Sequence, residues 1–111
     1  MKMINELICK IMKGLNIDCY YLEANCNKDK YVIFTIYNEN RLDQNLYDDD
    51  YIATTYNIQL SLWYKNPSDI NLYEDIKNKM KENGFYLKSV VDRKEGEFYG
   101  KTFDFLYEKD E

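Results

Sequence analysis

The stretch from Tyr51 to Tyr64 constrains the fold most, because the character of its side chains alternates with a period of two. Successive side chains of a β-strand point to opposite faces of the sheet. The even-numbered set is mainly apolar and predicts a core face: Ile52, Thr54, Tyr56, Ile58, Leu60, Leu62 and Tyr64. The stretch therefore predicts one long strand with a buried side and a second, more polar side.

The odd-numbered side chains of this strand are small and polar but carry no charge. A face open to bulk water more often carries Lys and Glu, whereas this one carries Thr55, Asn57, Gln59 and Ser61, with Trp63 at its end. Uncharged hydrogen-bonding groups beside an aromatic ring suit a protein–protein contact that retains water. An ordinary solvated face explains the pattern equally well, so both interpretations stay open.

Two amphipathic segments predict helices. The first runs from Ile4 to Lys13 and closes at Gly14, with one apolar stripe: Ile4, Leu7, Ile8, Ile11, Met12 and Leu15. The second opens at Pro67, Ser68 and Asp69, with Ser68 as its predicted N-cap, and closes at Gly84. Its predicted buried side chains are Leu72, Tyr73, Ile76 and Met80.

The remaining β-rich segments complete a single predicted domain over residues 1–111. Strands are expected at Cys19–Leu22, Tyr31–Tyr37, Phe85–Arg93 and Phe98–Glu108, with a turn at Glu23–Lys30 and a long hairpin loop at Asn38–Asp50. The order α-β-β-β-α-β-β predicts an α+β fold. We expect a mostly antiparallel sheet with two helices packed on one face.

The absence of histidine argues against an enzyme. It removes the usual proton shuttle at neutral pH and the commonest metal ligand, so Ser–His and Cys–His nucleophile pairs are impossible within one chain. The glycine-rich phosphate-binding motifs are also missing. A small enzyme that uses Asp, Glu, Tyr or Lys is the weakest of the alternatives, because nothing in the sequence selects its residues.

No metal or other cofactor is expected. Cys9, Cys19 and Cys26 lack C-x-x-C spacing, which argues against zinc and favours reduced thiols in an intracellular protein. The acidic run Asp48–Asp50 lacks the spacing of a calcium loop and is interpreted as solvated.

The charge balance argues against a protein that grips nucleic acid or lies in a membrane. Twenty acidic residues against 15 basic ones leave a net charge of −5, whereas phosphate binding needs a concentrated basic face. No apolar run approaches the roughly 20 residues that span a bilayer. The first residues also lack the features of a signal peptide.

Two regions together resemble the tail terminator (tail completion) proteins of tailed bacteriophages and phage-tail-like particles. The first region contains YNIQLSLWY at 56–64, LYEDI at 72–76, Met80 and the Gly84–Phe85 step. The second contains Asp92, Glu95, Gly96, the FY pair at 98–99 and TFDFLY at 102–107. The resemblance extends over nearly the whole chain by the order of its elements.

The resemblance implies a structural protein rather than an enzyme. Such subunits form a sixfold ring on the last ring of the tail tube, end its growth and join tail to head. The implied partners are further copies of the chain, the tail tube protein and, in addition, sheath and head–tail connector proteins, with DNA at most passing through. The implied location is the virion or tail-like particle, after assembly in the host cytoplasm.

Two alternatives to the tail terminator remain open. One is a head–tail connector of the same neck region, and the other is a small monomeric module that binds one protein. The candidate subunit-contact residues are Thr55, Asn57, Gln59, Ser61, Trp63, Leu46, Tyr47, Arg93 and Tyr99.

Overall fold

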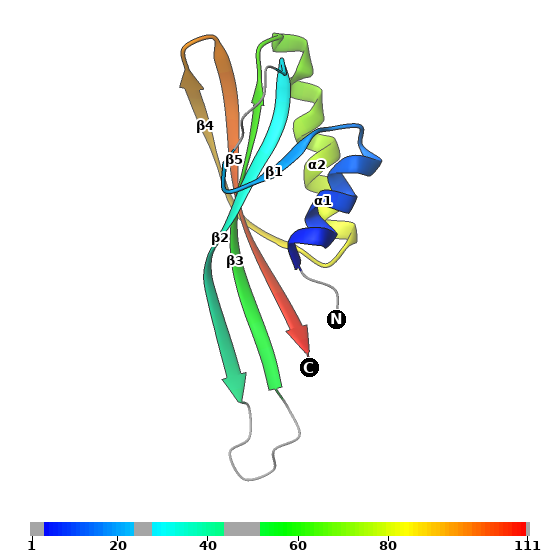
Figure 1. The fold of residues 1–111 in the computed structure, drawn as a ribbon, viewed down its shortest axis with the longest axis vertical. Coiled ribbons are helices and arrows are strands. Elements are labelled where there is room, and N and C mark those ends of the chain that lie inside the picture. The colour runs from blue at the N-terminus through cyan, green and yellow to red at the C-terminus, as the bar shows by residue number, and fades with distance from the viewer. Residues whose placement is uncertain (1–3, 24–27, 44–51, 111) are drawn as a thin grey trace.

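Two helices lie on one side of a five-stranded sheet, as Figure 1 shows. The computed structural model describes residues 4–23, 28–43 and 52–110. In chain order the elements are α1 (Ile4–Gly14), β1 (Cys19–Tyr21), β2 (Lys30–Asp43), β3 (Ile52–Tyr64), the 3-10 helix η1 (Pro67–Asn71), α2 (Leu72–Glu82), β4 (Tyr86–Glu95) and β5 (Phe98–Asp110). The predicted α+β fold and its element order are confirmed.

The sheet has the order β1-β2-β3-β5-β4 and is mostly antiparallel. The exception is β1, which pairs in parallel with β2 through Cys19–Tyr21 against Val32–Phe34. β1 is therefore a short edge strand that covers only part of β2. The sheet is mixed at this edge and antiparallel elsewhere.

The strand β2 is longer than the sequence predicts. We expected a loop from Asn38, but the strand continues to Asp43, so that boundary is wrong. The extension of β2 depends on tertiary structure, because Asn38–Asp43 pairs residue by residue with Ile52–Asn57 of β3. Backbone pairing with a long neighbouring strand outweighs the low strand propensity of a polar segment. In Figure 1 the ends of β2 and β3 extend well past the helices.

The second helix begins differently from the prediction. The N-cap is Asn66 and not Ser68, since the Asn66 side chain accepts a hydrogen bond from the Ser68 backbone N–H at 3.1 Å. Pro67 takes the first helical position, where its missing N–H costs nothing, so the cap must precede it. A 3-10 turn then leads into α2, which ends before Gly84 at φ +93°, as predicted.

The hydrophobic core lies between the helices and the even-numbered face of β3. Ile58, Leu60 and Leu62 have no exposed surface, and neither do Phe103 and Phe105 of β5. From α1 and α2 the fully buried side chains are Ile8, Met12, Ile76 and Met80. The predicted core face of Tyr51–Tyr64 is thus confirmed from Thr54 onward; Tyr51 and the Ile52 side chain lie outside the described part.

Trp63 lies on the opposite face of the sheet but is only 8% exposed. Its indole covers Gly100, its cross-strand partner on β5. A Cβ atom added to Gly100 would lie 2.6 Å from Trp63 Cζ3, closer than atoms can pack. The absence of a side chain at Gly100 therefore creates the space that the indole fills.

We predict that Gly100→Ala destabilises the protein by about 1–3 kcal/mol, because the indole must leave its site. Gly14→Ala is the matched control, since nothing lies within 4 Å of a Cβ there. The control should be neutral or stabilising by about 0.4–1 kcal/mol. Urea unfolding, followed by the fluorescence of the chain's one tryptophan, measures both changes. Equal stability of the two variants would contradict the packing described.

Candidate functional site

The face of the sheet that bears no helix is the candidate site, and we call it the open face. Cross-strand partners point to the same side, so the register defines its members. Its central residues are Ile33, Thr35 and Tyr37 of β2, Thr55, Asn57, Gln59 and Ser61 of β3, Thr102, Asp104 and Leu106 of β5, and Lys88, Ser89 and Val91 of β4. Most of these side chains are uncharged.

Two β-bulges deliver side chains to the middle of the open face. One bulge places Tyr37 between the paired residues of β2, and the other places Lys88 in β4. The Tyr37 hydroxyl donates a hydrogen bond to Asp104 Oδ1 at 2.6 Å. Lys88 Nζ lies 3.8 Å from Asp104 Oδ2 and donates to Asn57 Oδ1 at 3.2 Å. Bulges re-aim side chains in this way, and here both converge on one carboxylate.

This network leaves the centre of the open face without an unpaired charge. Asp104 is matched by Lys88, and their side chains are 30% and 41% exposed. An ion pair this exposed contributes only about 0–1 kcal/mol to stability. The network joins side chains of β2, β3, β4 and β5 across the centre of the open face.

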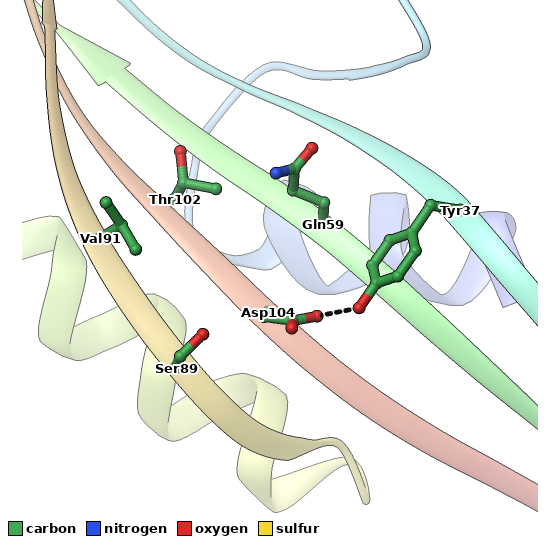
Figure 2. A pocket seen from close by; sticks show the side chains of 6 residues that line it. All are labelled: Tyr37, Gln59, Ser89, Val91, Thr102 and Asp104. Atoms are coloured by element: carbon green, nitrogen blue, oxygen red, sulfur yellow. Dashed lines mark hydrogen bonds between the residues drawn. The ribbon is translucent and has the colours of Figure 1, made fainter.

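A shallow hollow of about 280 Å³ adjoins the network, and Figure 2 shows the side chains around it. Tyr37 and Asp104 form one side, with their hydrogen bond drawn as a dashed line. The other lining residues are Gln59, Ser89, Val91 and Thr102. Val91 is 57% exposed and Tyr37 51%, so the hollow combines apolar surface with amide and hydroxyl groups. Such a mixture suits contact with a protein surface.

Six of the nine predicted contact residues lie on the open face: Trp63 and Arg93 at one end, and Thr55, Asn57, Gln59 and Ser61 along its centre. Gln59 is exposed, while Thr55, Asn57 and Ser61 are half-buried. Thr55 Oγ1 donates to the Asn40 carbonyl at 3.3 Å. Ser61 Oγ lies 3.0 Å from the Thr102 hydroxyl oxygen, with which it shares a hydrogen bond. The single chain therefore already satisfies part of the hydrogen-bonding capacity of this surface.

Arg93 and Tyr99 lie on different faces of the sheet. Arg93 is exposed on the open face, with its guanidinium 5.8 Å from the Trp63 ring centre. Tyr99 is on the face that bears the helices, where its ring stacks on Tyr64 with 5.7 Å between the centroids, so it does not join the others. Leu46 and Tyr47 lie outside the described residues.

Aromatic side chains close one end of the open face. Tyr31 packs edge-on against Phe98 at 5.8 Å between ring centroids and against Tyr20 at 6.1 Å. Trp63 is the cross-strand partner of Tyr31 and has little surface left to bury. This end of the face is thus ordered by packing within the single chain.

Sequence reasoning assigned no role to Tyr37, Lys88 or Asp104. The alternation of Phe103 and Phe105 around Asp104 does indicate that the carboxylate points away from the core. No sequence signal marks the two bulges, because a bulge depends on how many residues the partner strand supplies. The convergence on Asp104 is therefore visible only in the structure.

Within the described ranges, no three His, Cys, Asp or Glu side chains come together in a group that could hold a metal ion. The acidic run Asp48–Asp50 falls outside those ranges. None of the helices in the described part of the chain is both long and apolar enough to cross a membrane.

Searches against known protein families and against curated protein sequences give no match.

We predict that Asp104→Asn lowers the pKa of Tyr37. The hydrogen bond to Asp104 requires the phenolic proton, which raises the pKa of Tyr37 above its ordinary 10.0. A raised folded-state pKa stabilises the protein below the unfolded-state pKa. That contribution disappears as the pH rises through the folded-state value. NMR titration of labelled tyrosine, assigned with Tyr37→Phe, measures the change.

Glu108→Gln is the control for this titration. Glu108 is an exposed carboxylate on the same strand, paired with Thr55 away from Tyr37. The Glu108→Gln substitution should leave the pKa of Tyr37 unaltered. Identical Tyr37 titrations in the parent protein and Asp104→Asn would show that the hydrogen bond is absent in solution.

Proposed function

We propose that the protein is a structural subunit of a phage or phage-tail-like particle. In this proposal, copies form a ring that caps the tail tube, ends its elongation and provides the surface that joins tail to head. The open face is the main protein-contact surface. The observation that carries the proposal is that α1 and α2 pack on one side of the sheet, and that a broad and largely uncharged sheet face lies opposite.

The composition of the open face supports burial against another protein. Covering an unpaired charge is costly, but the central charges here compensate each other through Asp104 and Lys88. Tyr37, Val91 and Tyr86 expose between 51% and 69% of their surface on this side. Exposed apolar surface of this kind, surrounded by polar groups, is typical of interaction sites.

The shape of the subunit supports a ring. The chain extends over 55 × 24 × 24 Å, and the β2–β3 pair projects past the helices in Figure 1. A ring of identical subunits needs two different patches on each copy, set at an angle that allows closure. An elongated subunit offers such patches, one on the open face and the other on the projecting β2–β3 pair. The net charge of −5 also suits a passage through which DNA moves without sticking.

We predict that Gln59→Lys and Val91→Lys each weaken ring formation, because each adds a positive charge to a contact in which Asp104 is already paired with Lys88. Native mass spectrometry of the full chain, alone and mixed with the tail tube protein of the same genome, measures the stoichiometry. The unmodified protein should form a closed multimer, alone or on tubes. Each Lys variant should bind at least tenfold more weakly, a loss of about 1.4 kcal/mol or more.

Asn78→Lys is the matched control, since Asn78 is exposed on α2, on the other side of the molecule. It adds the same charge and should assemble normally. Thermal melts of all three variants separate lost assembly from lost folding. The proposal fails if the protein stays monomeric both alone and with tubes, or if it forms a one-to-one complex with a protein unrelated to tails.

A further inference from the structure

Two thiols face each other where α1 packs on the edge strand β1. Cys9 Sγ lies 3.4 Å from Cys19 Sγ, in a hydrogen bond between two half-buried side chains. The pair plays no part in the open face, which is on the other side of the sheet. Both cysteines are free in the described structure.

We infer that Cys9 and Cys19 are a site of reversible oxidation that joins α1 covalently to β1. The co-reactant is a small disulfide such as oxidised glutathione. A thiolate of the pair attacks it, forms a mixed disulfide and releases one glutathione. The second thiolate then displaces the other glutathione and forms the Cys9–Cys19 bond. The two thiol protons end on the two glutathione molecules, so atoms and electrons balance.

The geometry favours an intramolecular product. A disulfide bond is about 2.05 Å long, so the sulfur atoms must approach by roughly 1.4 Å. The two sulfurs are already in van der Waals contact, at 3.4 Å. The bond would close a short loop that contains the link from α1 to β1, and closing a loop removes conformational freedom from the unfolded chain.

The surroundings of the pair indicate a slow reaction that begins at Cys9. Burial, and then the hydrogen bond between the two thiols, raise the pKa of Cys19, so only a small fraction of this thiol is ionised and its displacement of the second glutathione is slow. Both thiols should therefore stay reduced in a reducing compartment. They should form the disulfide only after long exposure to an oxidising one. The consequence is local, because β1 is a short edge strand that pairs with β2 through Cys19–Tyr21. A bond to α1 would fix this edge strand in place.

The test uses the full chain carrying Cys26→Ser, incubated with oxidised glutathione and analysed by intact mass. The expected product is a monomer that has lost two hydrogen atoms and melts higher by on the order of 5 °C or more. Dithiothreitol should reverse both changes. Cys9→Ser and Cys19→Ser, in the same background, should show neither change, and their melts under reducing conditions establish that they are folded.

Three results would overturn the inference: a stable glutathione adduct on a single cysteine, disulfide-linked dimers, or no reaction in the folded protein while the urea-unfolded chain reacts. The inference goes beyond the proposed function and does not depend on it. Thiol oxidation is measured on the isolated chain, so its failure would leave the ring proposal unaffected.

Discussion

The pairing of β3 along both of its edges is the constraint on which the rest of the structure depends. β2 pairs with it from Lys30↔Tyr64 to Asp43↔Ile52, and β5 pairs with its other edge from Tyr99 to Asp110. An interior strand satisfies its backbone hydrogen bonds inside the sheet, so both of its faces are free for side-chain packing. One face then supplies the centre of the core and the other the centre of the open face.

The centre of the open face is broad, but its charges are paired within the single chain. Bulges in β2 and β4 turn Tyr37 and Lys88 toward Asp104, so the carboxylate is compensated before any partner arrives. At one end, Trp63 packs over Gly100, and the rings of Tyr31 and Phe98 pack edge to face. A surface whose side chains are already ordered loses little conformational entropy when it is covered.

The alternation of β3 and the stripes of both helices were predictable, because strand and helix periods appear directly in the spacing of apolar residues. The end of β2 was not, since the polar segment Asn38–Asp43 becomes a strand only through its partner on β3. The N-cap moved from Ser68 to Asn66 for a local reason, namely that Pro67 occupies the first helical position. Among the candidate contact residues, the odd numbering of Thr55, Asn57, Gln59 and Ser61 correctly placed them on one face of β3. Tyr99 lies on the face that bears the helices.

The sequence alone determined the α+β class, the order of the elements and the buried side of the central strand, because each follows from local periodicity and from turn and cap residues. Only the tertiary structure decided the strand order, the parallel pairing of β1, the two bulges, the covering of Gly100 by Trp63 and the contact between Cys9 and Cys19. These features join residues far apart in the chain. They depend on register and on which surfaces meet, and neither is encoded in the spacing of a single segment.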